Sequence, residues 1–97
     1  MTVVVTRDVA ARFRGFLASC MLEIAPGVYT GPRMTRGIRD RIWTVLESWF
    51  VEIGGSSIVM TWFDPTAPGG QDIRVLGAPP CELVDHDGVF LARKRDL

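Results

Sequence analysis

The sequence has 97 residues and no net charge at neutral pH, and 47% of its residues are hydrophobic. This length fits one domain, and the composition excludes an intrinsically disordered chain. No stretch approaches the roughly 18 apolar residues that a membrane-spanning helix needs, and the start MTVVVTRD lacks the basic leader and longer apolar run of a signal peptide. We therefore expect one domain over residues 1–97, in the cytoplasm and without a membrane partner.

The first part of the chain predicts a strand, a helix and a second strand. Residues 2–6, TVVVT, form a β-branched run that is typical of a buried strand. Apolar residues then recur at helical spacing over residues 9–24, and Asp8 is well placed to cap this helix. The segment LEIAPGVYTG leads into a second strand centred on residues 28–29, with an irregular start at Pro26.

The middle of the chain predicts a long helix, the clearest element of the sequence. Its apolar residues recur at helical spacing from about residue 35 to residue 53. Thr35 is suitably placed to cap the first turn, and the pair Gly54 and Gly55 ends the helix.

The remaining segments predict strands joined by turns. Residues 56–63 and 71–77 form two strands, which the turn-rich segment DPTAPGG connects. The second of these strands alternates, so that Asp72 and Arg74 lie on one side of it. A linker, APPCELV, then leads to an Asp–Gly turn and a last short strand around residues 89–92.

This order of elements predicts an α+β fold. It is a ferredoxin-like β-α-β-α-β-β sandwich with an extra C-terminal strand, in which both helices cover one face of the sheet. The other face then needs a cover of its own. We expect a homodimer in which two copies pack through that face, because a chain of this length has only a thin core.

Positive charge is concentrated in the first part of the chain. Residues 1–41 contain seven arginines and three acids, whereas residues 42–92 contain one arginine and seven acids. The predicted start of the second helix is surrounded by four arginines: Arg33, Arg36, Arg39 and Arg41. Free N–H groups at a helix start already attract anions. The cluster therefore indicates either a phosphate-binding site or a solvated helix face, and the residues alone do not decide between them.

A second basic pair, Arg12 and Arg14, lies in the first predicted helix. These two positions are about 200° apart around a regular helix, so the side chains do not share one face. A symmetric dimer doubles such groups, and a basic track across two subunits fits duplex DNA better than it fits a small anion.

Candidates for catalysis are few. Asp8 follows the first strand, and two copies of it in a dimer are able to hold a divalent cation such as Mg²⁺, although the simpler interpretation is a helix cap. His86, the only histidine, lies between two aspartates in a predicted turn. A solvated side chain is a simpler interpretation of this pattern than a metal site. No nucleophile motif, phosphate-binding loop or zinc spacing is present in the sequence.

Five segments, in this order and spacing, resemble the Cas-two family of CRISPR adaptation proteins in its type I-E branch: VVVTRDVAARFRG, LEIAPGVYTG, IRDRIW, SSIVMTW and VDHDGVFL. The resemblance runs from Val3 to about Lys94. Its most specific part is LExxxGVYxG followed by IRDRIW.

The resemblance implies a ferredoxin-like homodimer that bridges two dimers of the Cas-one family integrase. That assembly captures a short double-stranded DNA prespacer and inserts it as a new spacer, and the bridging dimer is mainly structural. In the family, the arginines matching Arg12 and Arg14 contact DNA phosphates, and a basic residue lies near position 36. The C-terminal segment, here residues 78–97, docks the integrase. The corresponding partner-binding candidates are Val89, Phe90, Leu91 and Arg93.

The chain departs from its type I-E relatives in two places. Some relatives have a basic pair where this chain has Pro80 and Cys81, and the arginines of residues 33–41 are candidates to replace that DNA contact. The first strand is followed by Arg7 and Asp8 instead of Glu-Asn. Many members outside this branch have an aspartate near here, and some are assigned metal-dependent nuclease activity. A metal-dependent endonuclease acting on RNA or DNA through paired Asp8 residues is therefore the alternative function, and whether the chain is an enzyme stays open.

Overall fold

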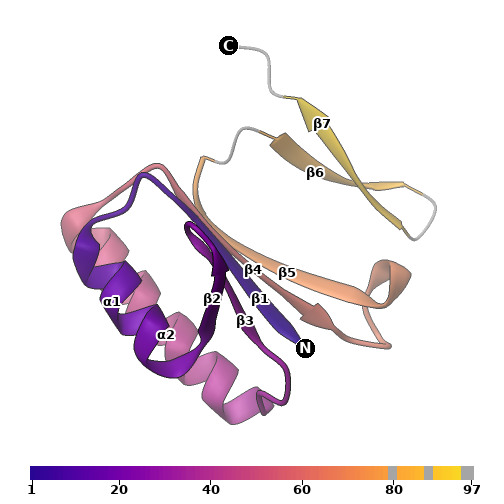
Figure 1. The fold of residues 1–97 in the computed structure, drawn as a ribbon. Coiled ribbons are helices and arrows are strands. Elements are labelled where there is room, and N and C mark those ends of the chain that lie inside the picture. Colours follow the sequence, from indigo (N-terminus) through magenta and orange to yellow (C-terminus); the bar gives the residue numbers. More distant parts are fainter. Residues whose placement is uncertain (79–80, 87–88, 95–97) are drawn as a thin grey trace.

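The computed structural model describes the backbone of residues 1–78, 81–86 and 89–94, and the side chains of residues 1–78 (Figure 1). The elements are β1 (Thr2–Arg7), α1 (Ala11–Cys20), β2 (Leu22–Ala25), β3 (Val28–Gly31), α2 (Arg36–Ile53), β4 (Ser57–Phe63), a short 3-10 turn η1 (Pro68–Gly70), β5 (Gln71–Gly77), β6 (Cys81–His86) and β7 (Val89–Lys94).

Five strands form one antiparallel sheet in the order β2-β3-β1-β4-β5. Both helices lie on the same face of this sheet (Figure 1). The run β1-α1-β2-β3-α2-β4 has the ferredoxin-like order, and β5 extends the sheet beside β4. The predicted fold class and the placement of both helices on one face are confirmed.

The first helix is shorter than predicted, and a hairpin follows it. Helix α1 ends at Cys20, and the next residue, Met21, is already extended, with φ −138° and ψ 165°. Strands β2 and β3 then pair across a turn at Gly27, whose φ is +77°. A Cβ at this glycine would lie 2.9 Å from the carbonyl oxygen of Thr6, so only glycine fits. The segment predicted as a helix end and one irregular strand is therefore a two-stranded hairpin.

Asp8 does not cap α1, contrary to the prediction. The N-cap is Ala10, which makes no side-chain hydrogen bond. The backbone of Asp8 is left-handed, with φ +49°, and its carbonyl accepts a hydrogen bond of 3.3 Å from the N–H of Ser56. This contact with the residue before β4 holds Asp8 outside the helix, so a long-range hydrogen bond takes the place of the expected local one.

Helix α2 agrees with the prediction at both ends. The hydroxyl of Thr35 accepts a hydrogen bond of 3.3 Å from the N–H of Ile38. Gly54 has a positive φ of 77° and ends the helix by donating its N–H to the carbonyl of Phe50 at 2.9 Å. Among the residues described, no helix is long and apolar enough to cross a membrane.

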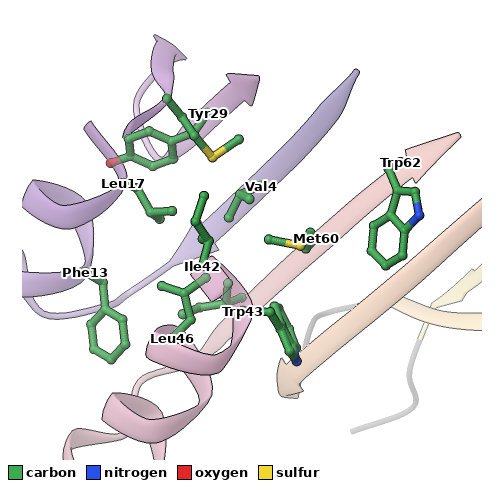
Figure 2. Close-up of a cluster of buried hydrophobic side chains, with 11 residues drawn as sticks. Val4, Phe13, Leu17, Tyr29, Ile42, Trp43, Leu46, Met60 and Trp62 are labelled. Atoms are coloured by element: carbon green, nitrogen blue, oxygen red, sulfur yellow. The ribbon is translucent and has the colours of Figure 1, made fainter. Parts of the chain in front are cut away.

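The hydrophobic core lies between the two helices and the sheet (Figure 2). Strand alternation gives the sheet two different faces: Val4 and Met60 are fully buried under the helices, whereas their neighbours point to the opposite side. On that open face, Val5, Phe63 and Val75 are 41, 71 and 40% exposed. The apolar open face is the one predicted to pack in a homodimer, and the dimer itself stays a prediction.

A second, two-stranded sheet forms the C-terminal part of the chain. Strands β6 and β7 are antiparallel, with Cys81 opposite Lys94 and His86 opposite Val89. The segment predicted as a linker is therefore partly a strand, and β7 extends beyond the predicted last strand of residues 89–92. The predicted Asp–Gly turn falls at residues 87–88, outside the described residues.

Candidate nucleic-acid interface

Arg12 is exposed at the start of α1 and stacks on an aromatic side chain of α2. The guanidinium carbon of Arg12 lies 4.2 Å from the centre of the Trp49 ring. Trp49 in turn makes edge-to-face contacts with Phe13 at 5.8 Å and Phe16 at 5.3 Å. Helix packing therefore places Arg12 beside a fixed, half-buried indole ring.

Arg14 points to a different part of the surface, as the 200° separation predicts. It lines a surface cavity of about 400 Å³ together with Glu23, Gly27 and Tyr29. An adjacent cavity of about 330 Å³ continues from Arg14 to Asp8. Arg14 and Asp8 therefore belong to one continuous depression between the start of α1 and the β2–β3 turn.

Tyr29 lines the part of this depression that contains Glu23. Its side chain is fully buried, and its hydroxyl has no hydrogen-bond partner among the residues described. Burial raises the pKa of Tyr29 to about 12, and the nearby Glu23 carboxylate acts in the same direction, while Arg14 opposes it. The phenol therefore keeps its proton to a higher pH than an exposed tyrosine does, and in this form it is able to donate a hydrogen bond.

The Asp8 carboxylate is exposed but has few neighbours suited to a metal. It accepts a hydrogen bond of 3.2 Å from the hydroxyl of Ser56 and lies 4.0 Å from the Arg7 guanidinium, and its side chain is 77% exposed. Residues 1–78, whose side chains are described, contain no group of three or more potential metal ligands. Residues 1–78 thus offer a single carboxylate here, and a second copy of the chain is able to supply further ligands for a metal site.

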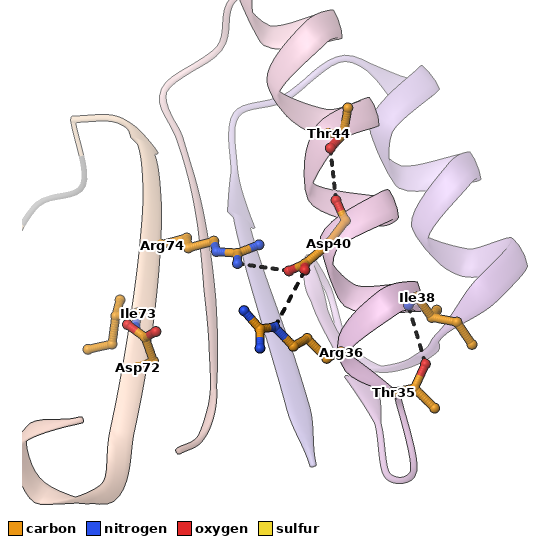
Figure 3. A network of polar contacts seen from close by, with 8 residues as sticks. All are labelled: Thr35, Arg36, Ile38, Asp40, Thr44, Asp72, Ile73 and Arg74. Atoms are coloured by element: carbon orange, nitrogen blue, oxygen red, sulfur yellow. Dashed lines mark hydrogen bonds and ion pairs between the residues drawn. The ribbon is translucent and has the colours of Figure 1, made fainter. Parts of the chain in front are cut away.

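Arg36, at the start of α2, shares a carboxylate partner with Arg74 of β5 (Figure 3). Arg36 lies 3.9 Å from the Asp40 carboxylate, and Arg74 of β5 donates a hydrogen bond of 2.8 Å to the same carboxylate. The predicted alternation put Asp72 and Arg74 on the same side of β5, and the structure adds that this side faces the helices, with Arg74 opposite Met60. Sequence reasoning missed its pairing with Asp40, because the two residues are 34 positions apart.

Arg39 packs into the structure more deeply than a surface phosphate contact requires. Its guanidinium carbon lies 4.2 Å from the centre of the Trp62 ring, and that of Arg74 lies 4.8 Å from the same centre. Trp62 is only 6% exposed, and the Nε of Arg39 is buried without a hydrogen-bond partner among the residues described. Arg39 thus contributes to packing between α2 and the sheet.

The basic residues form two groups at opposite ends of the helix layer. Trp49, which holds Arg12, is 13 positions after Arg36, and this spacing corresponds to about 20 Å along the helix. Arg12, Arg14 and Asp8 therefore lie toward one end of this layer, where Arg14 and Asp8 share a depression and Arg12 lies over Trp49. Arg36 and Arg39 lie at the other end, and Arg33 is exposed in the loop before α2.

The arginines also differ in how free their N–H donors are. Within residues 1–78, the ion pairs with a nitrogen–oxygen distance of 4.0 Å or less involve Arg7, Arg36 and Arg74. In this part of the chain, Arg12 and Arg14 have no carboxylate within that distance. They are therefore better placed than Arg36 to bind an incoming phosphate.

The predicted partner-binding residues lie on β7: Val89, Phe90, Leu91 and Arg93. Their side chains lie outside the described residues. The backbone places all of them on the same strand of the hairpin, and β7 lies beside η1.

Comparison with known families gives a match over nearly the whole chain. Residues 1–91 match the family model described as CRISPR-associated protein (Cas_Cas2CT1978). The match includes the whole five-stranded sheet, both helices, the two basic groups and β6.

Proposed function

The chain belongs to the CRISPR-associated Cas-two family, and from this premise we propose that it is a DNA-bridging structural subunit of the CRISPR adaptation complex. As a homodimer between integrase dimers of the Cas-one family, it binds the backbone of a double-stranded prespacer. The observation that carries the proposal is the start of α1, where Arg12 and Arg14 are exposed and have no carboxylate partner within residues 1–78.

A homodimer provides two copies of this basic pair. The apolar open face of the sheet supports such a dimer, because Val5, Phe63 and Val75 form an exposed surface that a second copy is able to cover. Four arginines would then contact the duplex. Each phosphate that they neutralise should add about 0.9 to the salt dependence of binding.

The arginines near α2 are secondary contacts in this proposal. Arg33 is exposed and has no carboxylate within 4.0 Å in the side chains described. The Arg36 side chain is 87% exposed, so a phosphate is able to compete with Asp40 for it. Arg39 is the weakest of the three candidates because its guanidinium is already packed on Trp62.

The integrase is proposed to dock on the C-terminal hairpin. Strand β7 carries Val89, Phe90, Leu91 and Arg93, and it forms a sheet separate from the five-stranded one. A two-stranded sheet is marginally stable by itself, so contact with a partner would stabilise it. Removing residues 79–97 should therefore abolish binding to the integrase while leaving the five-stranded sheet folded.

The second candidate function is a metal-dependent endonuclease. The observation that favours it is the exposed Asp8 carboxylate, which keeps lone pairs free beside the Arg14 depression. Two copies of Asp8 would have to meet across a dimer and bind Mg²⁺ or another divalent cation, which would activate a water molecule for attack on a phosphodiester. The neighbouring Arg7 guanidinium, at 4.0 Å, opposes a cation at this place.

Spacer integration by the purified cognate integrase separates the two functions. The reaction is run with the wild-type subunit, with Arg12→Ala/Arg14→Ala and with Asp8→Ala, and Arg12→Lys/Arg14→Lys serves as the control that keeps the charge. We expect integration to be lost with the alanine pair, to be retained in part with the lysine pair and to be unchanged with Asp8→Ala. Loss of integration with a folded, dimeric Asp8→Ala variant would instead place metal chemistry in the function.

A further inference from the structure

The guanidinium of Arg12, a proposed DNA contact, lies over the ring of Trp49. Trp49 of α2 is half-buried. Its ring makes edge-to-face contacts with Phe13 and Phe16 of α1, with interplanar angles of 78° and 68°. A ring fixed by two aromatic neighbours on another helix has little freedom to turn. The guanidinium of Arg12 rests over this ring at 4.2 Å.

Stacking uses only one face of the guanidinium. The N–H donors of arginine lie in the plane of the group and point outward from its edge. A phosphate binds these donors at the edge, often through two parallel hydrogen bonds. The stack on Trp49 and a bond to phosphate are therefore compatible in the same side chain.

Arg36 provides the contrast within the same molecule. Its guanidinium faces the Asp40 carboxylate at 3.9 Å, so a phosphate must compete with an anion that is already there. Arg12 has an aromatic neighbour and, within residues 1–78, no carboxylate neighbour. An aromatic ring orients the guanidinium without neutralising it.

We propose that Trp49 is a positioning residue for DNA binding: its ring holds the Arg12 guanidinium with the N–H edge free, before the phosphate arrives. The inference rests on the proposed function, since it assumes that Arg12 contacts DNA. A free arginine loses much rotamer freedom when it binds, and a pre-oriented one loses less. Trp49 thus strengthens DNA binding without touching the DNA.

Arg14 does not share this support, and this makes it the internal control. It lines the depression with Glu23 and Tyr29, and no aromatic ring stacks on it among the contacts of residues 1–78. A change at Trp49 should therefore reduce the contribution of Arg12 and leave that of Arg14 intact.

The test is a double-mutant cycle on the full chain, with a synthetic DNA duplex as the probe. Trp49→Leu is made in the wild-type, Arg12→Ala and Arg14→Ala backgrounds, and dissociation constants are measured by fluorescence anisotropy at one salt concentration. In the wild-type and Arg14→Ala backgrounds, we expect binding to weaken by roughly 5- to 30-fold for a dimer with two stacks. In the Arg12→Ala background, Trp49→Leu should have no further effect.

Trp49→Phe is the second variant, because it keeps an aromatic ring and most of the packing against Phe13 and Phe16. It should weaken binding less than Trp49→Leu does, and again only when Arg12 is present. The same loss with and without Arg12 would overturn the inference, since Trp49 would then act through general packing. So would a normal affinity in a folded Trp49→Leu protein whose Arg12→Ala counterpart binds weakly. Failure of the proposed function looks different: both Arg12→Ala and Arg14→Ala would bind the duplex as wild type does.

Discussion

Both helices begin with arginines, but the two starts surround them with different neighbours. At the start of α1, Arg12 stacks on Trp49 and Arg14 borders an open depression. At the start of α2, Arg36 faces Asp40, and Arg39 packs on the buried ring of Trp62. The number of positive charges at a helix start therefore does not give the number of free phosphate-binding groups. What matters is whether the guanidinium edge is already occupied.

The largest expected effect is at the start of α1. In Arg12→Ala/Arg14→Ala, duplex binding should weaken by roughly a thousandfold, if about 1 kcal/mol is lost at each of four contacts in the dimer. The slope of log affinity against log salt should become shallower by about 3.6, from four phosphate contacts. Titrations at several salt concentrations measure both quantities. An unchanged slope in a folded, dimeric variant would remove the start of α1 from the DNA interface.

Tyr29, which lines the depression beside Arg14, should make the free energy of unfolding depend on pH in the alkaline range. Because the folded protein raises the pKa of Tyr29 from 10.0 to about 12, it keeps the phenol proton where the unfolded chain has lost it. The free energy of unfolding contributed by this group is thus complete below pH 10 and is lost as the pH rises to about 12. Denaturant titrations across this range should show the decrease.

Tyr29→Phe is the matched variant for that measurement. It should flatten the alkaline decrease, and it should change stability at neutral pH by less than about 1 kcal/mol, because the hydroxyl that it removes has no partner in the described residues. An equally steep alkaline decrease in this variant would assign the titration to another group.

Asp40→Asn is designed to make the start of α2 more like the start of α1. The variant keeps the shape of the side chain but removes the charge that pairs with Arg36 and Arg74. Stability should fall by about 0.5–1 kcal/mol, a modest amount because the carboxylate is 44% exposed. DNA affinity should rise a few-fold, since the exposed Arg36 guanidinium loses its competing carboxylate. Chemical denaturation and anisotropy titrations measure the two changes. A fall in DNA affinity would contradict the claim that Asp40 competes with phosphate for Arg36.

A smaller loss of DNA binding than that of Arg12→Ala/Arg14→Ala is expected from Arg36→Ala/Arg39→Ala. The salt slope should become shallower by at most about 1.8 in the dimer, because Arg36 alone is exposed enough to reach a phosphate. Arg39→Ala alone should mainly lower stability, through the lost contact with Trp62. A slope that does not change in the double variant would exclude Arg36 and Arg39 from the interface. A change as large as that of Arg12→Ala/Arg14→Ala would remove the distinction between the two helix starts.

Most of the fold is predictable because its signals are local. Helix α2 follows from its apolar spacing, from Thr35 at its start and from the glycines after its end, and each of these acts within a few residues. The alternation of β5, which puts Asp72 and Arg74 on one side of the strand, is a local signal of the same kind. The order of elements and the family resemblance then lead to the ferredoxin-like arrangement that the structure has.

The wrong predictions, the Asp8 cap and the single strand after α1, concern places where a distant segment competes with a local signal. Asp8 is a good N-cap in isolation, but its backbone carbonyl is bonded to Ser56, which is 48 positions away. The hairpin of β2 and β3 depends on the turn at Gly27, whose carbonyl accepts hydrogen bonds from both the N–H and the hydroxyl of Thr6. Neither partner can be identified from residues nearby in the chain.

The sequence alone was sufficient for the type of each long element, the concentration of arginines before residue 42 and the family. It could not show which arginines are free, because this depends on pairs such as Asp40 with Arg74 and Arg12 with Trp49. Those pairs form only when α2 lies across the sheet and packs beside α1, which brings residues more than thirty positions apart within contact distance. Charge is a property of each residue, whereas the availability of a charge for a phosphate depends on the neighbours that folding supplies.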